Sequence, residues 1–220
     1  MPNRAGDLIW DEPKDAPGST LTRARVVQAA LDIADAKGLE AVSIRHVAAE
    51  LEVRPMSLYT HIASKDDLVA LMLNEMSARL LVPEPPDDWR EALRLIARRA
   101  YDAYVAHPWM IRAFGQGTRV GPNMLRRAEQ SAAAVASLGL KPADAWIVLS
   151  IVYDWTIGHA LHVVTLREDA ELESQLRSAD PDEFPRMSRV FGTGRGRASE
   201  TAFEVALEVV LDGIEQRFGN

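Results

Sequence analysis

A chain of 220 residues with 47% hydrophobic and 26% charged residues is an ordinary globular composition, long enough to bury a sizeable core. The absence of cysteine excludes a disulfide framework, a thiolate nucleophile and cysteine-ligated zinc. A net charge of −7 argues against indiscriminate nucleic-acid binding through a broad basic patch, and the lack of a signal-peptide-like segment favours a cytoplasmic protein.

Residues 1–20 are polar, rich in proline and glycine and without periodicity, which predicts a flexible arm. Within it, Trp10 is an apolar side chain that could dock elsewhere. A first helix is predicted from an N-cap at Thr22 to a stop at Gly38. Its apolar face consists of Val26, Ala29, Ala30 and Ile33.

Three further helices follow closely. Ser43 can cap the second, Pro55 is tolerated in the first turn of the third, and Ser64 begins the fourth with a capping-box-like sequence. The apolar faces of the second and fourth are Ile44, Val47, Ala48 and Leu51, and Leu68, Leu71, Met72 and Met76. Because the second and third helices are short and joined by a tight turn, they can support each other only through a small shared core. This is the helix-turn-helix arrangement.

A proline-rich stretch, 82–87, breaks the pattern and predicts a boundary between a domain of residues 21–82 and a larger domain of residues 83–220. Helical periodicity continues over about 88–106, 109–115, 123–138, 142–167 and 200–218, with a weaker candidate at 169–178. The polar, glycine-rich residues 180–198 are expected to form a loop. Since no segment shows strand periodicity, the predicted fold class is all-α.

Residues 21–76 resemble the DNA-binding domain of the tetracycline-repressor (TetR) family of transcriptional regulators. The resemblance is carried by Thr22-Arg23, Gly38, Ser43-Ile44-Arg45, the run 58–61, and Ser64-Lys65-Asp66 with Leu68. Lone helix-turn-helix patterns are common false positives, but this one has the flanking helices of the family. The remainder is similar only in helix order and in a closing amphipathic helix at 203–218.

The resemblance implies an N-terminal three-helix DNA-binding domain and a larger C-terminal helical bundle for ligand binding and dimerisation. It implies a homodimeric repressor, released from a pseudo-palindromic double-stranded DNA operator by a small lipophilic or aromatic effector. We predict no cofactor. Two alternatives stay open: a helical small-molecule-binding or catalytic protein with a vestigial helix-turn-helix, and an activator or ligand-independent DNA-binding regulator.

Geometry and the resemblance together indicate the side chains that contact DNA. Arg45 can make a bidentate contact to guanine, although a solvated surface arginine is the alternative. Tyr59 and His61 resemble the family's phosphate contacts, and Lys65 places an ammonium group at a helix N-terminus. The candidates are Thr22, Ser43, Arg45, Arg54, Pro55, Met56, Ser57, Tyr59, Thr60, His61 and Lys65.

Two features depart from the family pattern. Glu52 occupies a turn position where the family usually has glycine, because the backbone there tends to be left-handed. Pro55 and Met56 make the exposed side of the third helix unusually apolar, which suggests contact with a thymine methyl group. Leu58 and Ile62 are expected to lie in the core.

The second domain is rich in aromatic and soft side chains, as small-molecule pockets between bundle helices are. Any one of them could instead fill the core, but the resemblance favours a pocket for the set. The candidates are Tyr104, His107, Trp109, Met110, Phe114, Met124, Trp146, Tyr153, Trp155 and His159. His159 and His162 have a spacing compatible with a metal pair but no third ligand nearby, so we predict structural histidines and no metal.

Residues 146–164 are apolar nearly all round, which a solvent-facing helix cannot be. Polar groups such as Asp154 are costly in a bilayer, so we expect a buried helix and no membrane contact. Together with residues 203–214 it resembles the family's contribution to a four-helix dimer interface, with packing in a monomer core as the alternative.

Motifs of the common enzyme classes are missing: no nucleophile elbow, phosphate-binding loop or metalloprotease helix occurs in the sequence. Residues 192–197 are glycine-rich but follow no predicted strand, so a flexible loop is expected there. We therefore predict no catalytic residues and no enzyme activity.

Overall fold

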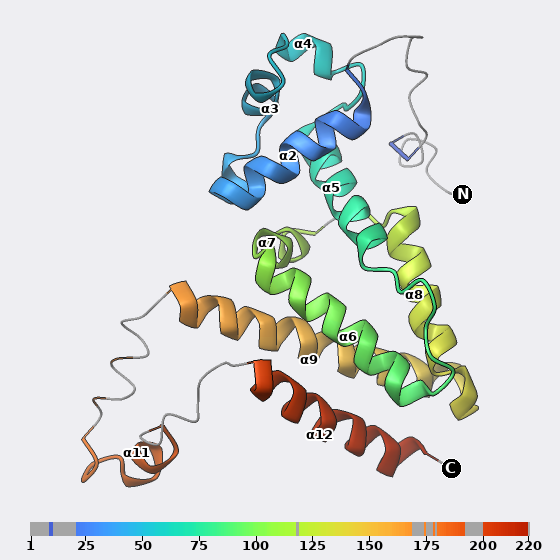
Figure 1. Cartoon of the computed structure of the whole chain (residues 1–220), viewed down its shortest axis with the longest axis vertical. Coiled ribbons are helices and arrows are strands. Elements are labelled where there is room, and N and C mark those ends of the chain that lie inside the picture. The colour runs from blue at the N-terminus through green and yellow to red at the C-terminus, as the bar shows by residue number, and fades with distance from the viewer. Residues whose placement is uncertain are drawn as a thin grey trace. The chain divides into compact units, whose positions relative to one another are not determined.

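The computed structural model describes residues 9–10, 21–117, 119–168, 174, 178, 180–191 and 200–219. Every regular element in these ranges is a helix (Figure 1), which confirms the predicted all-α class. The predictions for residues 1–8 and 11–20, for nearly all of 169–178 and for 192–197 lie outside the described residues.

The chain divides into two compact units. The first comprises Met1–Glu84 and Ala106–Ala133, and the second comprises Pro85–Val105 and Ala134–Asn220. The chain thus passes between the units three times, first between Glu84 and Pro85. The division of function after residue 82 stays a prediction.

The first unit is built from short helices whose ends are set by local chemistry. They are α2 (Arg23–Lys37), the 3₁₀ helix η1 (Leu39–Ala41), α3 (Ile44–Glu50), α4 (Pro55–Leu58), α5 (Lys65–Arg79), α7 (Trp109–Gly115) and α8 (Pro122–Ala134). The predicted caps are confirmed: the hydroxyls of Thr22, Ser43 and Ser64 accept from amides three residues along, at 3.3, 3.2 and 3.0 Å. α2 ends at Gly38, whose φ of 80° suits a residue without a Cβ.

The core of the first unit follows the predicted faces. All the predicted apolar residues of α2 and α5 are buried, as are Val47 and Ala48 of α3, whereas Ile44 and Leu51 are half-buried. α2 contacts both α3 and α5, and α3 contacts α4. The helix-turn-helix is therefore supported from below by α2, which in turn packs on α5.

Within the part of the chain that the structure describes, the second unit combines three long helices with two short ones. They are α6 (Trp89–Ala106), the 3₁₀ helix η2 (Ala136–Leu138), α9 (Pro142–Glu168), α11 (Pro185–Phe191) and α12 (Glu200–Phe218). α12 contacts α9 and contributes Phe203, Leu207, Leu211 and Ile214 to the core. The single helix predicted over 123–138 is two helices in the structure, α8 and η2. The α-helix ends before Val135, and the 3₁₀ helix begins after it.

The expected loop over residues 180–198 was wrong in part, because α11 occupies Pro185–Phe191. A proline in the first turn of a helix lacks only an amide hydrogen that would have no helical partner there. The glycines that suggested a loop all follow the end of this helix in the sequence.

α9 has one buried and one exposed side, so a single chain covers only part of the helix that was expected to be buried. The segment Pro142–Leu166 is long and apolar enough to cross a membrane by length and composition, and 33% of its most apolar window is buried. Val148, Val152 and Ala160 are buried, whereas Ile147 and Ile151 are 45% and 42% exposed. One chain therefore leaves an apolar surface of this helix uncovered.

Candidate nucleic-acid interface and effector site

α3 and α4 form the predicted helix-turn-helix. α4 is regular only to Leu58, and residues 59–61 continue it as a turn in which the amides of His61 and Ile62 both donate to Leu58 O, at 2.9 and 3.0 Å. The regular helix is therefore short, because the chain must turn toward the cap of α5 at Ser64. We call residues 55–62 the recognition segment.

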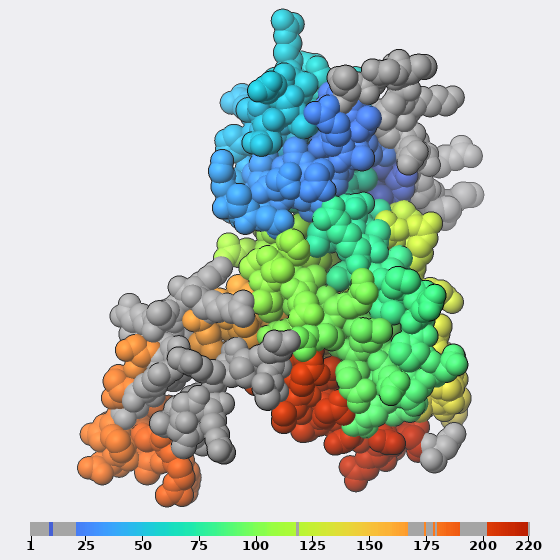
Figure 2. Space-filling view, in the orientation of Figure 1, coloured from blue at the N-terminus to red at the C-terminus, as the bar shows by residue number. Residues whose placement is uncertain are grey.

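The recognition segment has an inner and an outer side. Leu58 and Ile62 are 0% and 4% exposed, as predicted for core residues. Met56 and Tyr59, by contrast, are 74% and 50% exposed. The segment, in cyan, projects at one end of its unit (Figure 2). Exposed apolar side chains that lie together, on a segment whose other side is buried, are typical of a binding surface.

Other candidate DNA contacts surround this outer side. Arg45, Arg54 and Lys65 are exposed, as are Pro55 and Thr60, and Ser57 is half-buried. The Thr60 hydroxyl donates to Ser57 O at 2.8 Å, which orients it along the segment. The hydroxyl oxygens of Thr22 and Ser43 each accept a capping hydrogen bond from a backbone amide. Contact of these two residues with DNA stays a prediction.

His61 differs from its neighbours because its side chain is buried, at 9% exposure. Its carbonyl oxygen accepts a hydrogen bond from Arg23 Nε at 3.0 Å. A buried ring is poorly placed for the phosphate contact that the resemblance implies. The exposed Tyr59 is the better candidate for that contact.

Glu52 adopts the left-handed conformation expected at its position in the turn, with φ of 56°. It is the only residue other than glycine with positive φ among the described residues. The chain thus keeps the turn geometry without the glycine that relieves its strain.

In the first unit, two candidate effector residues share one carboxylate. His107 Nδ1 and Trp109 Nε1 lie 2.6 and 2.7 Å from Asp35 Oδ1, at the end of α2. Trp109 and Met110 are buried, and Phe114 and Met124 are half-buried. Trp109 therefore joins α7 to α2, and His107 joins the residues just before α7 to the same helix. Asp35 is a residue that sequence analysis missed because its partners lie more than seventy positions away.

In the second unit, Trp155 and His159 belong to an aromatic cluster. The His159 ring centroid lies 5.2 Å from Trp155, 5.8 Å from Tyr101 and 5.7 Å from Phe203. Burial, and then the nearby His162, lower the pKa of His159, which favours the neutral ring. Its Nε2 is buried without a hydrogen-bond partner among the described residues, so it could bind a polar group of a ligand. Tyr104 is fully buried in the same unit.

Trp146 and Tyr153 do not join this cluster. They are 72% and 41% exposed, and at 100° per residue Trp146 lies on the opposite side of α9 from Trp155. Nor do three or more His, Asp or Glu side chains gather to hold a metal ion in the described part of the chain.

Sequence comparison assigns both parts of the chain to the same family. Residues 26–72 match the bacterial regulatory proteins of the tetR family, and residues 82–218 match the tetracyclin repressor-like C-terminal domain. The chain is 31% identical to the HTH-type transcriptional repressor DrrR1 of Streptomyces coeruleorubidus, covering 96% of this chain and 85% of DrrR1.

The chain belongs to the TetR family. The class A tetracycline repressor protein of Escherichia coli from transposon 1721 is 28% identical, over 87% of this chain and 89% of that repressor. The TetR family protein ActR of Streptomyces coelicolor, in complex with actinorhodin, superposes with a TM-score of 0.78 at 28% identity. That match covers 92% of this chain and 99% of ActR. The chain is thus a regulatory protein of the TetR family.

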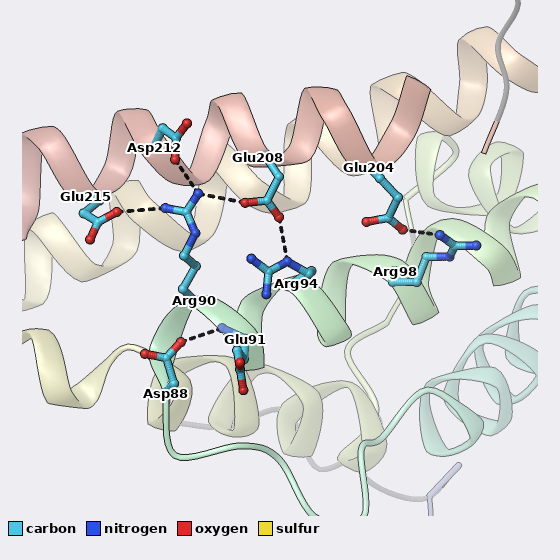
Figure 3. Close-up of polar contacts among 9 residues, drawn as sticks. All are labelled: Asp88, Arg90, Glu91, Arg94, Arg98, Glu204, Glu208, Asp212 and Glu215. Carbon is cyan, nitrogen blue, oxygen red and sulfur yellow. Dashed lines mark hydrogen bonds and ion pairs between the residues drawn. The ribbon is translucent and has the colours of Figure 1, made fainter. Parts of the chain in front are cut away.

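This TetR-family chain also has a row of ion pairs that sequence analysis missed (Figure 3). Arg90, Arg94 and Arg98 follow one side of α6 at intervals of four residues and pair with carboxylates of α12. Arg90 Nη2 and Arg94 Nε lie 2.7 and 2.6 Å from the Glu208 carboxylate. These hydrogen bonds, first from Arg94 and then from Arg90, lower the pKa of Glu208 to about 2. The spacing of the arginines was a signal, but their partners are distant in sequence.

Proposed function

We propose that this TetR-family chain acts as a homodimer whose two recognition segments read a pseudo-palindromic operator, and that a small lipophilic or aromatic effector releases it. The observation that carries the proposal is the two-sided recognition segment, with Leu58 and Ile62 buried and Met56 and Tyr59 exposed. We also propose that it works in the cytoplasm, where its operator would be, and that it has no catalytic role.

At the operator, base edges and phosphates are read by different residues. Arg45 contacts guanine through a bidentate pair, and Met56 contacts a thymine methyl group; a good pair of the first kind supplies about 1–3 kcal/mol of discrimination. Tyr59 and Lys65 contact phosphates, which fix the register of the protein on DNA without reading sequence.

The homodimer uses the uncovered sides of α9 and α12. Ile147, Ile151 and Leu161 of α9 are exposed, as are Val205 and Val209 of α12, at 62% and 67%. A second copy would cover these residues and form a four-helix interface. Dimerisation also supplies the second recognition segment, because one such segment buries too little surface for tight specific binding.

The effector site is proposed at the aromatic residues of α6, α9 and α12 in the second unit. ActR was solved in complex with actinorhodin, which supports a small-molecule effector for this chain. The Nε2 atom of His159 would bind a polar group of the ligand, while the rings of Tyr101 and Trp155 would bind its apolar part.

Footprinting on the DNA that flanks its own gene, repeated with a panel of antibiotics and metabolites, tests the proposal. We expect protection of an inverted repeat, lost with at least one lipophilic or aromatic compound. By linkage, operator DNA must weaken binding of that compound by the same factor. Undetectable DNA binding at low salt would favour the vestigial helix-turn-helix instead, and protection that no compound removes would favour a ligand-independent regulator.

A further inference from the structure

The recognition segment needs support from the rest of its unit. Its regular part is only four residues long, and a helix of that length is not stable alone. Leu58 and Ile62 secure its inner side. Its end is held by Arg23, in the first turn of α2, whose Nε donates to His61 O at 3.0 Å.

The same guanidinium holds a second carbonyl group. Arg23 Nη1 donates to Ile9 O at 2.9 Å, so one side chain joins the amino-terminal segment to the end of the recognition segment. A guanidinium is planar and its donors have fixed directions, so the two bonds together fix where both carbonyls lie. Ile9 and Arg23 also line a groove of about 420 Å³ together with Tyr59, Thr60 and His61.

Trp10, the next residue, is fixed by close packing. A Cβ atom added to Gly121 would lie 2.9 Å from Trp10 Cη2 and 2.3 Å from Asn74 Oδ1, so only glycine permits this approach. Asn74 Oδ1 in turn accepts from Asn123 N at 2.9 Å. The half-buried indole therefore lies beside Gly121 and Asn74, where α5 meets the start of α8.

We propose that Arg23, Ile9 and Trp10 are positioning residues for DNA reading. Trp10 anchors the amino-terminal segment, Ile9 O accepts a hydrogen bond from Arg23, and Arg23 holds the turn that follows Leu58. Through this chain of contacts they set the orientation of Tyr59 and Thr60 on the outer side of the recognition segment. The inference rests on the proposed DNA-binding function.

The test uses the full-length chain and an operator selected from a random duplex pool. Affinity is measured for this operator and for an unrelated duplex of equal length, below the unfolding transition of every variant. Arg23→Ala and Trp10→Ala should each lower operator affinity about tenfold or more, because hydrogen bonds to a charged group are lost or loosened. Affinity for the unrelated duplex should change less than about threefold, since one charge at most is removed.

Conservative and matched variants separate positioning from stability and charge. Trp10→Phe should keep most of the operator affinity that Trp10→Ala loses, since it keeps an aromatic ring beside Gly121 and Asn74. Lys37→Ala removes the same charge as Arg23→Ala from the far end of α2, where it is exposed, and should leave the ratio of the two affinities unchanged. A variant that lowers both affinities in parallel would show a purely stabilising or electrostatic role and overturn the proposal.

Two deletions test whether the first residues act directly. Removal of residues 1–8 should preserve the operator affinity, whereas removal of residues 1–10 should reduce it as Trp10→Ala does. If the shorter deletion already causes the loss, residues 1–8 contact DNA themselves and the positioning role is overturned. A wild-type chain that prefers no duplex would overturn the proposed function, whereas a specific wild type with neutral variants overturns this inference alone.

Discussion

At the scale of single residues, Glu52 is in the backbone conformation that its side chain least favours. Its φ of 56° is left-handed, and its side chain is exposed. Glu52→Gly should raise the free energy of unfolding by about 1 kcal/mol, because it relieves the clash of Cβ with the backbone without removing a buried contact. Urea denaturation monitored by circular dichroism measures the change.

A glycine placed in an ordinary helix provides the control. Glu129 is exposed within α8, and Glu129→Gly should lower the free energy of unfolding by about 1 kcal/mol. If both variants lowered the free energy of unfolding equally, the left-handed backbone of Glu52 would not be strained.

Residue-scale predictions succeeded where the cause was local. Thr22, Ser43 and Ser64 were recognised as caps because a hydroxyl finds its amide three residues along the chain. The buried side chain of His61 could not be foreseen, because it depends on packing in three dimensions. The pairing of Arg23 with Ile9 O likewise joins residues that no local pattern connects.

At the scale of helices, the ion pairs between α6 and α12 should make stability depend on acidity. The pKa of Glu208 is lowered from 4.5 to about 2 in the folded chain, so folding favours the carboxylate. Its contribution is complete above pH 4.5, and it is lost as the pH falls from there toward about 2. Unfolding measured across this range should show a wild type that loses stability with acid more steeply than Glu208→Gln.

The control for this experiment removes one exposed carboxyl elsewhere. Glu129→Gln lies in the first unit and should leave the acid dependence close to that of the wild type. Parallel curves for wild type and Glu208→Gln would contradict the assignment of the pKa shift to the pairs with Arg94 and Arg90.

Helix boundaries were predictable where periodicity and caps coincide, as in α2, α5, α6 and α12. α11 was missed because its seven residues are too few to establish a periodic pattern. The extent of α9 was predicted, but which of its sides a single chain buries was not. Which sides of an apolar helix are covered depends on its neighbours, so Trp146 and Tyr153 were assigned to a pocket although both are exposed.

At the scale of the whole molecule, the exposed apolar sides of α9 and α12 predict a dimer. One charged side chain introduced on either side should weaken it. Val209 is 67% exposed on α12, beside the exposed Val205. Val209→Glu should weaken dimerisation at least about a hundredfold, because a two-fold interface buries the new charge twice. Sedimentation velocity over a range of concentrations measures the shift to monomer.

Ala128→Glu adds the same charge on the exposed side of α8, which is not one of the two helices proposed for the interface, and should leave the dimer intact. A Val209→Glu variant that remained dimeric would place the interface on another surface. Loss of the dimer with retained helicity would support the four-helix interface and should also weaken operator binding.

The claim on which the account depends is that two recognition segments present their outer sides to base edges, and sequence selection from a random duplex pool tests it most directly. The wild type should select two half-sites related by a two-fold axis, with centres about 34–36 Å or a multiple of that distance apart. Arg45→Ala should lose the preference for guanine at one position in each half-site while keeping helicity and the dimer. A single unrepeated site, or base preferences unchanged by Arg45→Ala, would contradict the account.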